Sequence, residues 1–189
     1  MRMLPTTIQM FSALGSFSDE EQQWIMQHLQ WYDVKEGAMI LSEGDICDAV
    51  YFLEKGYCYQ YKQEDEDEKV IDLHLPGEWI FIQQSLVRQE PSLVAIRAFQ
   101  DGRVARLGLK QMHALMSLAP AFLQFGRLFN QGQERLLMFD ETMDPAEKYA
   151  YLMQTRPEIA AVFPVKMIAS YLKLAPETLS RVRAKYRIS

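Results

Sequence analysis

The chain has 189 residues, of which 49% are hydrophobic and 24% are charged, and these values argue against a disordered chain. The 25 Asp and Glu residues outnumber the 20 Lys and Arg residues, so the net charge is −5, which taken for the whole chain argues against binding to nucleic acid. One large domain or two small domains fit this length.

The charge is distributed unevenly along the sequence. Residues 1–143 carry a net charge of −9, whereas residues 144–189 carry +4. We therefore expect a polyanionic partner to meet only the C-terminal quarter, near Arg181 and far from the acidic run 64–68. The adjacent carboxylates of that run cannot converge on a cation, so we interpret the run as the solvated tip of a hairpin.

Several classes of protein are disfavoured by what the sequence lacks. No apolar run reaches the roughly 18–20 residues that span a bilayer, and residues 1–15 do not have the layout of a signal peptide. Two cysteines cannot form a disulfide framework, and with three histidines they show no metal-ligand spacing. No Ser-His-Asp or Cys-His arrangement is evident. We therefore expect a cytoplasmic protein with no membrane segment, no metal site and no catalytic residues.

The N-terminal two thirds of the chain predict helix first and then strands. Ser18 and Glu21 have the spacing of a capping box, which begins a short packing helix. From residue 33 to about residue 109 the pattern changes to short β-type runs separated by glycine-containing turns, with no helix between them. These runs predict a compact β-roll or barrel. They span residues 39–41, 50–53, 57–61, 70–75, 93–98 and 104–108.

Helical spacing returns after Lys110. From position 122 onward, apolar or small residues recur at alternating steps of three and four, which is the pattern of a coiled-coil seam. This pattern predicts a long dimerisation helix within residues 111–143, although a single helix lying on the β-roll would show the same stripe. The seam residues are Phe122, Phe125, Phe129, Gly132, Leu136 and Phe139.

A second domain begins near Asp144, where an N-cap, a proline and the capping-box residue Glu147 start a new helix. Residues 165–184 then have the apolar spacing of a helix-turn-helix, with Lys173 at the turn position where glycine is usual. A left-handed backbone at Lys173 would be strained by about 1 kcal/mol or more. The predicted inner residues are Ile168, Ala169, Leu172, Leu174, Leu179 and Val182.

The second helix of this pair has an outer face suited to DNA. If Leu179 and Val182 are buried, then Glu177, Ser180 and Arg181 point outward together near the end that enters a major groove. Arg can bond guanine, Glu can accept from cytosine, and Ser can serve either base. A small helical protein-interaction module with a basic face is the alternative. The candidates for phosphate contact are Thr178, Arg183, Lys185 and Arg187.

The order of these parts resembles the CRP/FNR superfamily of bacterial transcription regulators. Residues 42–56 are similar to the family's early β-roll signature, and Pro176-Glu177-Thr178-Leu179-Ser180-Arg181 is similar to the recognition helix of the FNR branch, whose E-x-x-S-R residues read bases. The resemblance implies an α+β fold in which a double-stranded β-helix of the cyclic nucleotide-binding type is followed by a winged-helix-like domain. The expected parts are a sensor (1–110), a connecting and dimerisation helix (111–143) and a helix-turn-helix domain (144–189).

The same resemblance implies an effector site. In the family, a Gly-Glu pair holds the ribose hydroxyl of a cyclic nucleotide and a later Arg-Ser/Thr pair holds its phosphate. Gly77 and Glu78 match the first pair, but Ser92 and Leu93 stand where the second is expected, and Arg88 fits only if an insertion is ignored. A buried phosphodiester without a cation is costly, so we expect another small molecule. The expected pocket residues are Gly77, Glu78, Trp79, Ile80, Arg88, Ser92 and Leu93.

Together these features favour a homodimeric, sequence-specific transcription regulator that binds pseudo-palindromic double-stranded DNA and, as an activator, also RNA polymerase. The alternative is a cyclic-nucleotide-binding regulatory module that acts through protein contacts. Iron–sulfur sensing of the FNR type is not expected because there is no N-terminal cysteine cluster. A cupin-like enzyme would need metal ligands that three scattered histidines do not supply. We therefore expect a protein that is not an enzyme.

Overall fold

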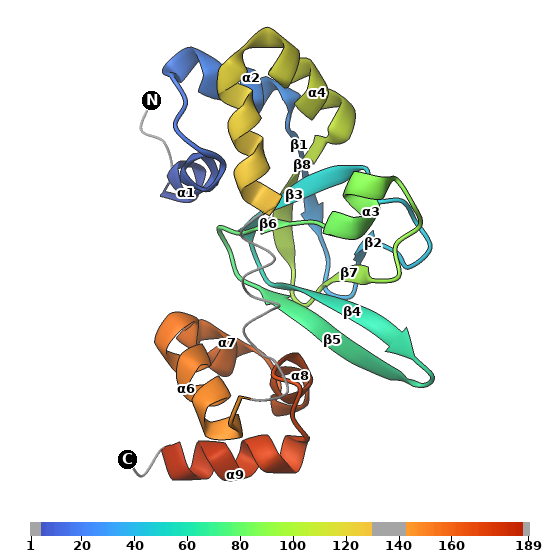
Figure 1. Ribbon diagram of the computed structural model, residues 1–189, viewed down its shortest axis with the longest axis vertical. Coiled ribbons are helices and arrows are strands. Elements are labelled where there is room, and N and C mark those ends of the chain that lie inside the picture. The colour runs from blue at the N-terminus through green and yellow to red at the C-terminus, as the bar shows by residue number, and fades with distance from the viewer. Residues whose placement is uncertain (1–4, 130–142, 187–189) are drawn as a thin grey trace.

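The computed structural model describes residues 5–129 and 143–186, which form a middle layer of strands with helices at both ends (Figure 1). The N-terminal part contains α1 (Pro5–Leu14), α2 (Asp19–His28), β1 (Gln30–Val34), β2 (Met39–Leu41), β3 (Ala49–Lys55), β4 (Cys58–Glu64), β5 (Asp67–His74), β6 (Trp79–Ile80), α3 (Gln83–Arg88), β7 (Ala95–Ala98), β8 (Gly102–Gly108), α4 (Leu109–Leu118) and the 3-10 helix η1 (Pro120–Gly126). The C-terminal helices are α6 (Pro145–Thr155), α7 (Pro157–Val162), α8 (Val165–Tyr171) and α9 (Pro176–Tyr186).

The strands form two four-stranded antiparallel sheets, in the orders β1-β8-β3-β6 and β2-β7-β4-β5. We call this pair of sheets, residues 30–108, the β-roll. The turn at Gly56, between β3 and β4, touches the turn at Gly102, between β7 and β8. Gly56 has a φ of +88°, and a Cβ built there would lie 2.7 Å from the Cα of Gly102. Any side chain at Gly56 would therefore separate the turns.

All six predicted β-type runs contain a strand. The structure adds β1, β6 and helix α3, so the expectation that no helix interrupts the strands was wrong. Among the described strands, β1 lies at the edge of its sheet next to β8, and its residues Gln30, Tyr32 and Asp33 are exposed. An edge strand with one buried residue lacks the alternating apolar pattern on which the prediction relied.

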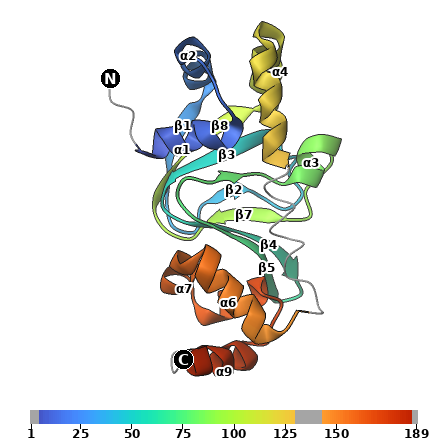
Figure 2. The same cartoon turned by 60° about the vertical axis from the view of Figure 1, so that its left-hand side comes forward.

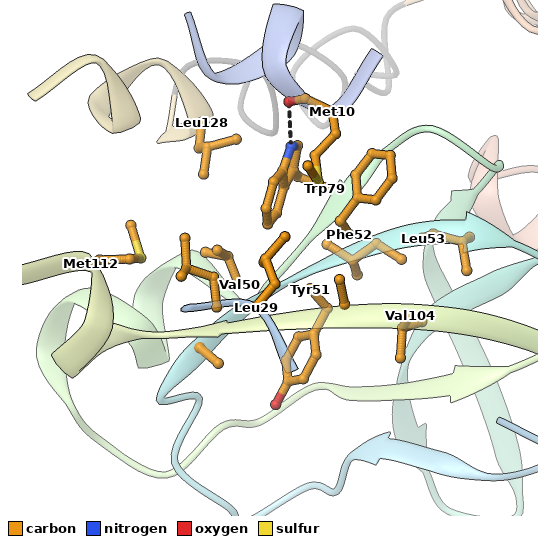
Figure 3. Close-up of a cluster of buried hydrophobic side chains, with 14 of the residues drawn as sticks. Met10, Leu29, Val50, Tyr51, Phe52, Leu53, Trp79, Val104, Met112 and Leu128 are labelled. Atoms are coloured by element: carbon orange, nitrogen blue, oxygen red, sulfur yellow. Dashed lines mark hydrogen bonds between the residues drawn. The ribbon is translucent and has the colours of Figure 1, made fainter. Parts of the chain in front are cut away.

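The N-terminal core lies where the helices cover the sheet that contains β3 and β8. Figure 3 shows Met10 of α1 and Leu128 on the side of Trp79, and Met112 of α4 on the side of Val50. The rings of Phe52 and Trp79 are 5.4 Å apart, and the Trp79 indole N–H donates to the carbonyl of Met10 at 3.2 Å. The tryptophan therefore links α1 to the β-roll through both packing and a satisfied polar atom.

The long helix predicted for residues 111–143 is not continuous. Helix α4 ends at Leu118, Ala119 is extended (φ −150°, ψ 142°), and η1 begins at Pro120. Proline cannot donate the backbone hydrogen bond that would continue α4, and it disfavours a helical conformation in the residue before it. Pro120 therefore separates η1 from α4.

The predicted dimer seam is also corrected by the structure. Phe122 and Phe125 are fully buried in the core of their own chain, beside Phe17 and Trp24. The prediction is wrong for these two residues, since neither side chain is available to a partner. Phe129 is half-buried, with its ring edge-on to Phe81 at 5.6 Å. Three seam residues lie outside the described residues: Gly132, Leu136 and Phe139.

The C-terminal helices begin as predicted. Asp144 caps α6, and the side chain of Glu147 completes a capping box. Helix α8, a short turn and α9 follow, with Pro176 as the first residue of α9. Lys173 in the turn has a φ of +56°, so the left-handed backbone considered from the sequence is present. Of the predicted inner residues, Ile168, Ala169, Leu172 and Leu179 are fully buried, and Leu174 and Val182 are half-buried.

The C-terminal helices pack against the outer face of β4 and β5. The ring of Phe163 lies 4.7 Å from that of Phe99 and 6.0 Å from that of Tyr57, and the Val70 N–H donates to the hydroxyl of Ser170 at 2.9 Å. Figures 1 and 2 both place α9 at the end of the molecule farthest from α2 and α4. The fold therefore presents α9 away from the N-terminal helices.

Candidate functional site

The outer face of α9 carries the predicted base-reading residues. Leu179 is fully buried where α9 packs against α6 and α8, whereas Glu177, Ser180 and Arg181 are exposed. These three residues share one helical face, since they are spaced by three and four. The Arg181 guanidinium donates to the hydroxyl of Thr178 at 3.4 Å, which orients Arg181 along the helix.

The candidates for phosphate contact are placed less uniformly. Lys185 is exposed, whereas Arg183 and Thr178 are half-buried. Arg187 lies outside the described residues. Of the two described cations among these phosphate-contact candidates, Lys185 is thus the exposed one.

The turn before α9 is held by a lysine that the sequence analysis did not identify. Lys148 of α6 is 2% exposed, and its ammonium donates to the carbonyl of Leu172 at 3.2 Å. The N–H groups of Lys173 and Leu174 donate to Ser170 and Ala169 at 3.0 and 2.8 Å. These bonds satisfy the carbonyls at the end of α8 and fix where α9 begins.

The predicted effector residues lie in different surroundings. Trp79 and Ile80 are buried in the core, while Leu93 is 63% exposed. The Ser92 hydroxyl is buried and bonded within its own turn, donating to the carbonyl of Val94 at 2.6 Å. Gly77 has a φ of +92° and serves the turn between β5 and β6. That these residues line one effector pocket stays a prediction.

Arg88 and Glu78 complete the predicted effector set, and they lie on different elements. Arg88 is exposed in the last turn of α3. Glu78 accepts two hydrogen bonds from Arg156 of the C-terminal helices, at 2.8 and 3.0 Å. The carboxylate implied by the resemblance to hold a ligand hydroxyl is thus bonded to a cation of the same chain.

Comparison with known proteins places the β-roll in a family. Residues 32–118 match the family model of the cyclic nucleotide-binding domain. This segment is a cyclic nucleotide-binding domain. No curated protein sequence matches the chain significantly.

Solved structures share the fold beyond that domain. The catabolite activator protein of Thermus thermophilus is 19% identical, with coverage of 93% of this chain and 86% of that one and a TM-score of 0.58. FixK2 of Bradyrhizobium japonicum is 15% identical over 85% of each chain, with a TM-score of 0.67. The c-di-GMP-responsive global regulator CLP of Xanthomonas campestris is 14% identical over 90% of this chain and 92% of that one, also at 0.67. These neighbours are CRP/FNR regulators, so the resemblance seen in the sequence is confirmed for the fold.

Arg156 joins the cyclic nucleotide-binding domain to the C-terminal helices. Besides Glu78, it donates to the backbone carbonyl of Leu73 at 2.6 Å and to the hydroxyl of Tyr171 at 3.1 Å, and it lies 3.6 Å from the carboxylate of Asp72. The side chains of Arg156 and Asp72 are 12% and 6% exposed. A guanidinium with its donors directed at several acceptors is a rigid link between the two parts.

Both cysteines of the cyclic nucleotide-binding domain are buried and free. Burial raises the pKa of the Cys58 thiol to about 12 and also raises the pKa of Cys47, so neither is a thiolate at neutral pH. Within the described residues, no group of three His, Cys, Asp or Glu side chains could hold a metal ion. No helix in the described part of the chain is long and apolar enough to cross a membrane.

Proposed function

We propose that this protein is a cytoplasmic, homodimeric, sequence-specific DNA-binding transcription regulator of the CRP/FNR type. The C-terminal helices would read DNA, and the cyclic nucleotide-binding domain would sense a small molecule. The observation that carries this proposal is the outer face of α9, where Glu177, Ser180 and Arg181 are exposed together on a helix at the end of the molecule. Their chemistry suits base edges in a major groove.

Two further observations support the proposal. Residues 144–189 carry a net charge of +4 in a chain whose total is −5, which favours approach of a polyanion from this end. The structural neighbours include a catabolite activator protein and a regulator of gene expression. A partner copy would place two α9 helices against successive major grooves, which requires a two-fold symmetric site. As an activator, the protein would also contact RNA polymerase.

The proposal is tested by selecting duplexes from a random pool with the full-length protein and sequencing those retained. We expect enrichment of a pseudo-palindrome with two half-sites, together with a dimer mass in sedimentation velocity. Retention of duplexes without any shared sequence would instead support the basic-faced interaction module.

The proposed roles of Arg181 and Lys185 on α9 can be distinguished by comparing affinity for selected duplexes with affinity for random duplexes. Arg181→Ala is expected to weaken binding to the selected duplex by roughly 1–3 kcal/mol and to relax preference at one base position, because a fork onto guanine is lost. Lys185→Ala is expected to weaken binding to selected and random duplexes alike, because a phosphate contact carries no sequence information. Fluorescence anisotropy on both duplexes measures the difference. Equal losses on both duplexes for Arg181→Ala would contradict its assigned role.

The effector is proposed to be a molecule other than cyclic AMP or cyclic GMP. In isothermal titration calorimetry neither nucleotide is expected to bind at micromolar concentration, because Glu78 is bonded to Arg156 and Ser92 to its own turn. Micromolar binding by the wild type that is lost in Glu78→Ala would instead favour the alternative, a cyclic-nucleotide-binding regulatory module.

A further inference from the structure

The acidic hairpin that connects β4 and β5 lies beside α8, contrary to the expectation that it would be far from the DNA-reading part. Asp67 at the start of β5 accepts a hydrogen bond from the ammonium of Lys166 at 2.9 Å. Three residues further, the Val70 N–H donates to Ser170 of the same helix. The hairpin and α8 therefore touch along two successive turns of the helix.

A surface cavity of about 630 Å³ separates the hairpin from the start of α9. One wall carries the carboxylates of Glu64, Glu66 and Asp67, and the other carries Lys166 and Lys173. Pro176, the first residue of α9, lines the same cavity. The acidic tip of the hairpin, residues 64–68, thus faces α8, the turn that follows α8 and the beginning of α9.

The charges of the tip are only partly neutralised. Glu68 pairs with Arg97, and Glu64 lies 3.5 Å from Lys69. Among the described residues, no cation lies within ion-pair distance of Asp65 or Glu66. The tip therefore keeps an excess of negative charge beside α8.

In a helix-turn-helix, the first helix crosses the DNA backbone while the second enters the groove. Lys166 and Lys173 are exposed and would lie near phosphates in such a complex. In the structure Lys166 is instead paired with Asp67, and the remaining carboxylates would repel phosphates at distances within about one Debye length, ~8 Å at physiological salt.

We propose that the acidic tip of the β4–β5 hairpin is an autoinhibitory element that occupies the phosphate-contacting side of α8 and lowers affinity for DNA until it moves away. This inference rests on the proposed DNA-binding function and adds its regulation. The Lys166 and Asp67 side chains are 77% and 78% exposed, so their ion pair contributes little stability and is readily exchanged for a phosphate. The element is weak enough to be released by an effector or by DNA itself.

The test compares two full-length variants that remove the same amount of charge. Glu66→Gln with Asp67→Asn removes two carboxylates at the tip, whereas Glu20→Gln with Glu90→Gln removes two exposed carboxylates from α2 and from the loop after α3. We expect the tip variant to bind both selected and random duplexes about 10-fold more tightly than the wild type at ~0.1 M salt. Its log–log salt dependence is expected to steepen by about 0.9, since Lys166 gains a phosphate.

A second variant holds the hairpin in place. Asp67→Cys with Lys166→Cys, joined by a short bismaleimide, is expected to bind DNA at least about 10-fold more weakly than the same protein before linkage, because carboxylates of the tip are kept within a Debye length of the phosphates. Cys47 and Cys58 are buried and leave the linkage specific to the new pair. Circular dichroism checks that each variant is folded.

Three outcomes are decisive. The inference is overturned if the control variant gains as much affinity as the tip variant, because net charge alone would then explain the effect. It is also overturned if the linked protein binds as tightly as the unlinked one. If the wild type and every variant fail to bind any duplex, the proposed function fails instead.

Discussion

Replacement of Phe122 by alanine is expected to lower the free energy of unfolding by about 3–5 kcal/mol and to leave the oligomeric state of the folded protein unchanged. The ring is fully buried and has three aromatic neighbours: Phe17 at 5.7 Å, Phe125 at 5.7 Å and Trp24 at 6.2 Å. Its removal leaves a cavity that the surrounding rings cannot fill, and it also removes the link between η1 and the segment before α2. Urea unfolding and sedimentation velocity give the two readouts.

The adjacent residue provides a matched control. Leu123 lies in the same 3-10 helix but is 67% exposed, so Leu123→Ala is expected to change the free energy of unfolding by no more than about 0.5 kcal/mol. Suppose instead that Phe122→Ala dissociated a dimer at concentrations where the wild type stays associated, while the free energy of unfolding was unchanged. The hypothesis of a coiled-coil seam that includes Phe122 would then be supported again. That result would require a conformation in which Phe122 faces a partner.

The strands were predictable because their signals are local. Glycines at the turns and apolar runs between them gave six of the strands, and the capping residues Ser18 and Asp144 gave two helix starts. The interruption of the predicted long helix could not be inferred from periodicity. Apolar residues at steps of three and four fit a segment buried in its own chain as well as a dimer seam. Pro120, which separates α4 from η1, is also a residue that suits the first turn of a helix. Whether a proline at this position begins a helix or interrupts one depends on the residues packed around it.

The candidate site divides in the same way. Exposure of Glu177, Ser180 and Arg181 follows from helical geometry once Leu179 is buried, and the structure has that pattern. The partner of Glu78 was not predictable, because Arg156 is 78 positions away and the pairing exists only after the two parts of the chain pack together. The position of the acidic hairpin beside α8 could not be predicted, because the net charge of a segment does not indicate where that segment lies in the fold.

Replacement of Arg156 by alanine is expected to destabilise the protein by on the order of 3 kcal/mol, because it leaves Asp72 and Glu78 without their guanidinium partner at a largely buried contact. The loss should be felt mainly where the C-terminal helices meet β5, so amide hydrogen exchange should accelerate in α8 and β5 before the core of β3 and β8. Chemical unfolding followed by far-ultraviolet circular dichroism gives the total change.

An exposed ion pair of nearly equal length is the control for Arg156. Lys35 lies 2.7 Å from Asp101, but their side chains are 84% and 61% exposed, so Lys35→Ala is expected to leave stability nearly unchanged. Combining Arg156→Met with Asp72→Asn and Glu78→Gln should recover much of the loss, since no uncompensated charge then remains buried. If Arg156→Ala were as mild as Lys35→Ala, the guanidinium would not be what holds the C-terminal helices against the β-roll. The aromatic contact of Phe163 with Phe99 would then be the main attachment.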